Sequence, residues 1–174
     1  MEELKYPIGK FSYSGTLTPD QRKACIDRID ATPANLRRAV AGLSEAQLNE
    51  TYRPQGWTLR QVVHHVADSH LNAYQRFKLV LTEDHPRIKT YKEALWAEEP
   101  DARTLPVDVS IQLLEALHGR WVTRLRSMDT AAFARTLDHP EQGAVNLDFM
   151  LALYAWHGQH HTAHILGWRK RSGV

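Results

Sequence analysis

The sequence predicts an all-α fold, a four-helix bundle with short extra helices in the connections. Four stretches carry apolar residues at helical spacing, and no alternating pattern typical of strands competes with them. Hydrophobic residues make up 43% of the chain, which is enough to fill one core, so we expect a single domain over residues 1–174. Bundles of this kind often build metal sites from side chains on facing helices.

The first long helix has a clear start signal. Residues 1–17 contain turn-forming residues without a clear period and are expected to form an extended arm over the surface. Thr18 and Pro19 are typical of an N-cap and a first helical turn. The amphipathic pattern that follows continues to Leu43, and Pro33 is expected to kink or briefly break the helix.

The second helix has a stronger start signal than the first. Thr58 and Gln61 have the spacing of a capping box, and a helical pattern runs from there to about Leu81. Residues 82–107 contain three prolines, which favours a long connection with at most a short helix around residues 91–96. Long connections often carry functional residues.

The third and fourth helices follow from periodicity and capping. Residues 108–128 form the third, and Asn146 can cap a fourth that continues to about Lys170, after a loop with Pro140 and Gly143. In the third helix one face is expected to be buried, formed by Val109, Leu113, Leu114, Leu117, Trp121 and Leu125.

Charge and composition exclude several classes of partner. The formal net charge is only +2, so we expect neither nucleic-acid nor membrane binding. The longest apolar run, residues 149–156, is far shorter than the roughly 20 residues that span a bilayer. The lone Cys25 excludes an internal disulfide, and no signal-peptide pattern is present, so we expect a cytoplasmic protein.

Four of the ten histidines lie on the fourth helix, as two pairs with i, i+4 spacing: His157 with His161, and His160 with His164. That spacing separates the side chains by only about 40° around the helix and about 6 Å along it, so both imidazoles of a pair can reach one ion. The first pair centres roughly 30° from the apolar stripe and the second roughly 90° from it. We therefore place His157 and His161 inside the bundle and expect His160 and His164 beside the ligands or half-exposed.

A third ligand must come from elsewhere, because tightly held ions of this type generally take three or four protein ligands. His64 and His65 lie on opposite shoulders of the second helix, and periodicity does not choose between them. His65 begins a polar ladder that continues with Ser69, Asn72 and Arg76. The other candidates are His70, His85, His118 and His139.

The segments 56–70 and 156–164 closely resemble the YfiT branch of the DinB-like proteins, and the similarity spans nearly the whole chain. The resemblance implies a four-helix bundle with an unusual connection order, and a cytoplasmic, homodimeric, metal-dependent hydrolase. It also implies one zinc or nickel ion per subunit, bound by His65, His157 and His161. All three histidines are present, so the resemblance supplies the choice of His65.

Three neutral imidazoles leave open positions on a divalent ion, as in catalytic sites, so hydrolysis of a small-molecule substrate by an activated water is the expected chemistry. The helix-four motif contains no carboxylate base, so Asp68 and His164 are the candidate catalytic residues for proton transfer. Asn72 and Arg76 are candidates for holding the substrate. One alternative is a transferase that moves a low-molecular-weight thiol to an electrophile.

A second alternative is a non-enzymatic protein whose ion is stored or only stabilises the bundle. It predicts a closed site, in which a fourth protein ligand comes from His64, His118 or Asp68.

Overall fold

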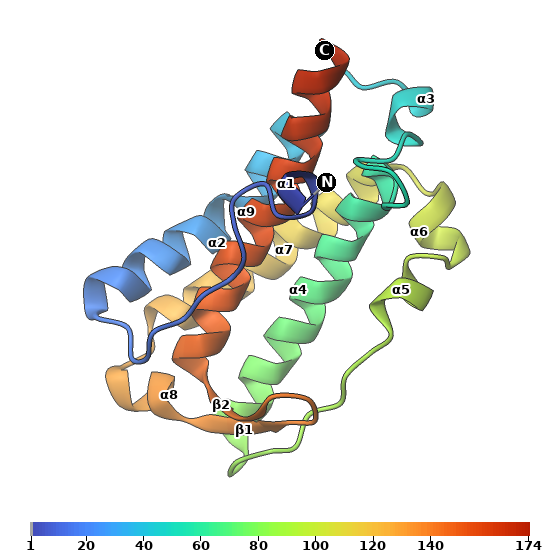
Figure 1. Cartoon of the computed structure of the whole chain (residues 1–174). Coiled ribbons are helices and arrows are strands. Elements are labelled where there is room, and N and C mark those ends of the chain that lie inside the picture. Colours follow the sequence, from blue (N-terminus) through green and yellow to red (C-terminus); the bar gives the residue numbers. More distant parts are fainter. Residues whose placement is uncertain (1) are drawn as a thin grey trace.

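Four long helices form the body of the protein (Figure 1). The computed structural model describes residues 2–174. α9 packs against α2 and α4, and α7 packs against the same two helices. The first two long helices in the chain therefore lie diagonally across the bundle rather than side by side. The long helices are α2 (Pro19–Val40), α4 (Leu59–Thr82), α7 (Val107–Arg126) and α9 (Leu147–Ser172).

Three of these helices begin at the residue predicted to cap them: Thr18, Thr58 and Asn146. Each cap accepts a hydrogen bond on its side chain from a main-chain N–H of the first turn, which would otherwise lack a partner. α9 ends at Gly173, whose left-handed backbone is a common helix stop. Among residues 2–174, no helix combines the length and apolar character needed to cross a membrane.

The connections contain short elements, and one of them corrects the sequence prediction. Residues 136–146 form a β-hairpin near the start of α9, where only a loop was expected, with Leu137 opposite Val145 (Figure 1). Strands of four residues are too short to display a recognisable alternation. The short elements are α1 (Glu2–Lys5), α3 (Glu45–Leu48), α5 (Glu93–Trp96), α6 (Pro100–Thr104), α8 (Thr130–Ala134), β1 (Thr136–His139) and β2 (Gly143–Asn146).

Pro33 does not break α2, so the expected break, one of the two outcomes considered, is wrong, and the helix continues through Pro33 to Val40. Proline has no N–H, so the carbonyl of Ile29, four residues earlier, loses its usual helical donor. That carbonyl instead accepts a hydrogen bond from Nδ1 of His118 on α7, at 2.7 Å. A contact between helices thus replaces the one that proline removes.

The buried face of α7 is narrower than predicted. Val109 and Leu113 are 49% and 44% exposed. Leu114, Trp121 and Leu125 are buried as expected. The apolar positions span more of the helix circumference than α2 and α4 cover, so those at its edge face solvent.

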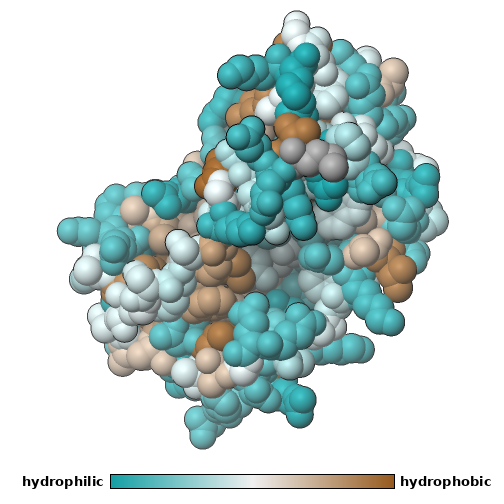
Figure 2. All heavy atoms as spheres, viewed as in Figure 1, coloured by the Kyte–Doolittle hydropathy of each residue, from teal (hydrophilic) through white to brown (hydrophobic). Residues whose placement is uncertain are grey.

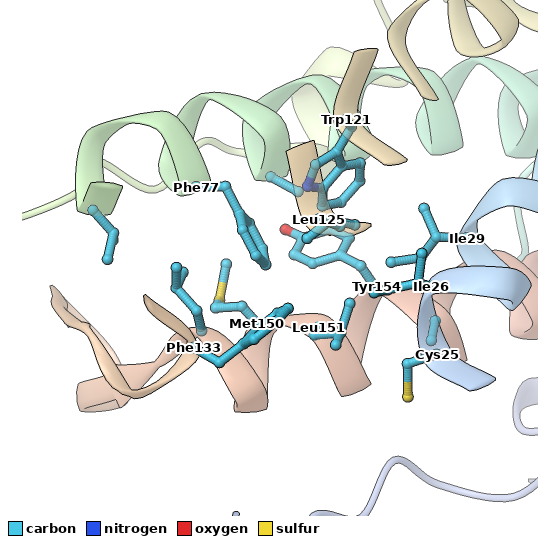
Figure 3. Close-up of a cluster of buried hydrophobic side chains, with 14 of the residues drawn as sticks. Cys25, Ile26, Ile29, Phe77, Trp121, Leu125, Phe133, Met150, Leu151 and Tyr154 are labelled. Atoms are coloured by element: carbon cyan, nitrogen blue, oxygen red, sulfur yellow. The ribbon is translucent and has the colours of Figure 1, made fainter. Parts of the chain in front are cut away.

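The apolar core consists of two clusters separated by a layer of polar side chains. Figure 3 shows one cluster, in which Phe77 of α4, Trp121 of α7 and Met150 of α9 meet Ile26 of α2. The second cluster contains Leu36, Val66, Leu114 and Ile165, from the opposite half of the same four helices. Between the two clusters, each of α4, α7 and α9 contributes histidine, at His70, His118 and residues 157–164.

Candidate metal centre

Three histidine side chains converge between α4 and α9. One ring nitrogen from each of His65, His157 and His161 lies within 4.8 Å of the other two. Nε2 of His65 and Nε2 of His157 are 3.2 Å apart. Two imidazole nitrogens on a tetrahedral ion, each about 2.0–2.1 Å from it, would be about 3.3–3.4 Å apart. The spacing therefore suits two ligands of one ion.

The structure brings His65, and not His64, to this position. Nδ1 of His64 lies 2.7 Å from the hydroxyl of Ser110, and its Nε2 lies 3.1 Å from the carbonyl oxygen of Leu105. Both nitrogens of His64 are thus engaged on the side of the connection and α7. The indole of Trp57 packs against the imidazole of His65, with ring centres 4.6 Å apart, and limits its movement.

The electrostatics keep these three imidazoles neutral. Burial lowers the pKa of His65 to about 4, with His160 and His164 as further contributors. Burial also lowers the pKa of His157 and His161 well below the usual histidine value. A neutral imidazole retains the lone pair that a metal ligand requires, so the donor set is ready at neutral pH.

The residues fit a divalent ion such as Zn²⁺ or Ni²⁺. Within residues 2–174, Nδ1 of His161 is buried without a hydrogen-bond partner, so this nitrogen is not engaged elsewhere in the described chain. Three imidazoles match the ligand preferences of both ions. Among residues 2–174, no fourth histidine, cysteine or carboxylate joins the group. His64 and His118, named for a closed site, have their nitrogens engaged elsewhere.

His160 and His164 are buried, which corrects the prediction that they might be half-exposed. The ring of His160 stacks on Trp156 and lies near Tyr6 of the arm. Nε2 of His164 donates to the carbonyl of Lys5, and its ring stacks on Tyr52. The helical wheel of α9 alone does not include these covering segments, one of which crosses α9 in Figure 1.

A cavity of about 650 Å³ reaches the metal centre. His157 is part of its lining, so a small molecule in the cavity can approach the ligand cluster. The remaining lining comes from α4, the connection before α5, the start of α5, the hairpin and α9. It includes Ser69, Arg76, Tyr91, Glu93, His139, Glu141 and Tyr154.

Arg76 lines this cavity as a buried cation that is only 8% exposed. Its guanidinium donates to the carbonyl oxygen of Lys89 at 3.1 Å and to the hydroxyl of Tyr154 at 3.4 Å. Within the described residues 2–174, no carboxylate forms an ion pair with it. A buried positive charge without a counter-ion favours an anionic ligand.

The other predicted site residues, Asn72, Asp68 and His164, are not among the residues that line this cavity. Asn72 lines a neighbouring cavity of about 780 Å³ that shares Arg76 and Tyr91, and its amide donates to the carbonyl of Asp68. Burial raises the pKa of the Asp68 carboxyl to about 6, with a smaller contribution from Asp101. His164 does not line the cavity. No observation tests a catalytic role for Asp68 or His164, and both roles remain predictions.

The sequence reasoning missed two tyrosines of the cavity. The hydroxyl of Tyr91 is buried, and burial raises its pKa well above the usual value, with Ser69 as a smaller opposing contributor. Tyr154 is part of the apolar core, yet its hydroxyl also contacts Arg76. Tyr91 lies in the proline-rich connection, whose length was the only sequence signal for it.

Comparison with known proteins agrees with this geometry. The family model of the DinB superfamily matches residues 28–165. The chain belongs to the DinB superfamily. Over 98% of both chains, this DinB-superfamily protein is 52% identical to proteins of Bacillus mycoides and Bacillus cereus that carry the name "Putative metal-dependent hydrolase".

A solved structure is similar throughout. YfiT from Bacillus subtilis, described as "a probable metal-dependent hydrolase with an unusual four-helix bundle topology", aligns with a TM-score of 0.96 at 42% identity over 98% of both chains. The predicted fold and the predicted family are therefore confirmed.

Proposed function

We propose that this DinB-superfamily protein is a metal-dependent hydrolase of small molecules. The main support for the proposal is the position of His157, which is one of the three clustered histidines and also lines the 650 Å³ cavity. When bound, a divalent ion at such a site lowers the pKa of water toward about 7 and polarises a carbonyl or phosphoryl oxygen. The names of the relatives support the same reaction class.

The cavity favours a substrate that carries an anionic group. Arg76 would bind a carboxylate or phosphate, because its charge has no counter-ion in the described chain. The hydroxyl of Tyr91, which lines the same cavity, would donate a hydrogen bond to the same substrate. Asn72, beside Arg76 in the neighbouring cavity, would contact a larger substituent.

Asp68 and His164 are the proposed groups for proton transfer. A carboxyl with a pKa of about 6 can accept a proton near neutral pH, and Asp68 lies one helical turn from His65. His164 lies beside His161, with ring centres 5.3 Å apart, and one of its nitrogens has no partner. We further propose Zn²⁺ or Ni²⁺ as the ion and a homodimer as the assembly.

The test combines metal analysis with an activity panel. Wild-type protein and the His157→Ala/His161→Ala variant are stripped with a chelator and reloaded with Zn²⁺ or Ni²⁺. Both are then assayed on esters, amides and phosphoesters with and without a carboxylate. We expect hydrolysis only with loaded wild-type protein, and faster hydrolysis of the anionic substrates.

A parallel assay measures consumption of an electrophile with and without an added low-molecular-weight thiol. Turnover that requires the thiol would replace the hydrolase proposal with the transferase alternative. Metal binding without turnover in either assay would favour the non-enzymatic alternative. Equal metal content in the wild type and the double variant would overturn the site itself.

A further inference from the structure

A row of buried histidines joins the metal centre to the main chain of α2. Nδ1 of His157 lies 3.2 Å from Nε2 of His70, and Nδ1 of His70 lies 2.9 Å from Nε2 of His118. Nδ1 of His118 in turn lies 2.7 Å from the carbonyl oxygen of Ile29. The row therefore crosses the bundle from α9 through α4 and α7 to α2.

The carbonyl at the end of this row is available because of Pro33. In a regular α-helix the carbonyl of Ile29 would accept from the N–H of residue 33, which proline lacks. A buried carbonyl without a donor is costly, so His118 supplies one. The proline in the middle of α2 thus has a consequence on the neighbouring helix α7.

The carbonyl also sets the direction of every hydrogen bond in the row. An oxygen of this kind only accepts, so Nδ1 of His118 carries the hydrogen. In a neutral ring the other nitrogen is then an acceptor, so His70 must donate through its Nδ1, and His157 through its Nδ1. The rings of His70 and His118 are fully buried and contact each other, so a positive charge on either ring would be costly and the neutral forms are favoured.

We propose that the carbonyl of Ile29, acting through His118 and His70, fixes the ring tautomer of His157 and directs its Nε2 lone pair toward His65 and the ion. His70 and His118 are then positioning residues for the metal centre rather than ligands. This inference depends on the proposed function only for the assignment of His65, His157 and His161 as the metal ligands. The tautomer is a property of the metal-free chain.

The row of histidines predicts that the ring of His157 is held in a fixed orientation and tautomer more firmly than the ring of His161. His157 has a partner that holds its ring and its tautomer, whereas in the described part of the chain Nδ1 of His161 is buried without one. Partners of this kind orient a metal-binding imidazole and raise its basicity, and their loss typically weakens metal binding about 10- to 100-fold. Removal of the His118 ring is therefore expected to weaken metal binding at His157, although His118 is separated from His157 by the ring of His70.

The first experiment reads the tautomers directly. Metal-free wild-type protein labelled with ¹⁵N in histidine is studied by long-range ¹H–¹⁵N NMR, which distinguishes protonated from unprotonated ring nitrogens. We expect hydrogen on Nδ1 and none on Nε2 in His70, His118 and His157. Hydrogen on Nε2 of His157 would overturn the proposal, and no variant has to fold for this result.

The second experiment compares two substitutions of His118. In His118→Gln the side-chain oxygen reaches the position of Nε2 and can still accept from His70, whereas His118→Leu leaves Nδ1 of His70 without an acceptor. Zn²⁺ affinity is measured by competition with a chelating dye, and folding is checked by urea unfolding of the metal-free forms. We expect His118→Leu to lose about 10- to 100-fold in affinity and His118→Gln to retain most of it.

The outcomes separate this inference from the proposed function. Equal loss of Zn²⁺ affinity in the two variants, or no loss in either, would overturn the positioning role. Wild-type protein that binds no Zn²⁺ would overturn the metal centre whatever the NMR result. Zn²⁺ binding and the expected tautomers without any hydrolysis would refute only the proposed reaction and would support the inference.

Discussion

His157 and His161 have the same spacing on α9 as His160 and His164, yet the two pairs meet different parts of the molecule. The first pair faces His65 of α4 and forms the cluster at the cavity. The second pair is covered by aromatic rings and by the arm, with His164 donating to the carbonyl of Lys5. Burial is similar for His160, His161 and His164, so burial alone does not mark the ligands.

The comparison shows that i, i+4 spacing becomes a metal site only where a third donor lies opposite. α4 presents His65 to the first pair, whereas Tyr52 and Trp156 stack on the second. Aromatic stacking occupies a ring face and fixes an imidazole without providing a donor atom. Three predictions test this difference between the pairs.

The largest effect is expected from matched double substitutions that keep a ring and remove its nitrogens. His157→Phe/His161→Phe should weaken Zn²⁺ binding by more than about 1,000-fold, because two of three donors are lost. His160→Phe/His164→Phe should retain bound Zn²⁺, measured by elemental analysis after dialysis. Loss of the ion in the second variant and not in the first would reverse the assignment of the pairs.

A second prediction concerns the pH dependence of the metal-free protein. Burial lowers the pKa of His160 and His164 to about 4, from an ordinary value of 6.5. Between these values the unfolded chain binds more protons, so the free energy of unfolding falls as pH decreases from 6.5 toward 4. Each such histidine contributes up to about 1.4 kcal/mol per pH unit.

The measurement is urea unfolding of the metal-free protein at several pH values between 7.5 and 5. The His160→Phe/His164→Phe variant should show a shallower dependence than the wild type, because two buried titrating rings are gone. A variant as steep as the wild type would mean that His160 and His164 bind protons equally in both states.

The smallest effect is expected at Gly158, the residue that allows α2 to approach α9 beside the ligands. A Cβ at Gly158 would lie 2.5 Å from Oγ1 of Thr32, whose hydroxyl already donates to the carbonyl of Arg28. Gly158→Ala should therefore lower the free energy of unfolding by about 1–3 kcal/mol. Gly119→Ala on α7, where a Cβ meets nothing within 4 Å, should raise it by about 0.5–1 kcal/mol.

Thermal or urea unfolding of both glycine variants, with metal removed, checks this pair. A stabilising effect of Gly158→Ala would show that the contact between α2 and α9 relaxes easily. In that case close packing at Gly158 would not explain the position of the ligands.

Much of the fold could be predicted because its signals are local. Capping residues such as Thr18, Thr58 and Asn146 act within one helical turn, so the starts of three long helices were predicted from short stretches of sequence. The hairpin at residues 136–146 was missed because its strands are short and depend on pairing. Val109 and Leu113 were misplaced because exposure depends on how much of α7 its neighbours cover.

The candidate metal site could also be predicted from the sequence only in part. The helical repeat by itself places His157 and His161 on one face of α9, because four residues return nearly to the same angle. Periodicity left His64 and His65 equivalent, and only the position of α4 beside α9 in the folded chain sends His65 to the ligands and His64 to Ser110. The choice depends on contacts between helices, which no pattern within one helix contains.

Pro33 illustrates both what the sequence determines and what the tertiary structure decides. The sequence alone determines that the carbonyl of Ile29 lacks its helical donor, because proline has no N–H wherever it occurs. Only the tertiary structure decides that His118 supplies the missing donor, and that His70 and His157 follow in a row. Ile29, His118, His70 and His157 lie on four different helices, so packing of the whole bundle is what joins them.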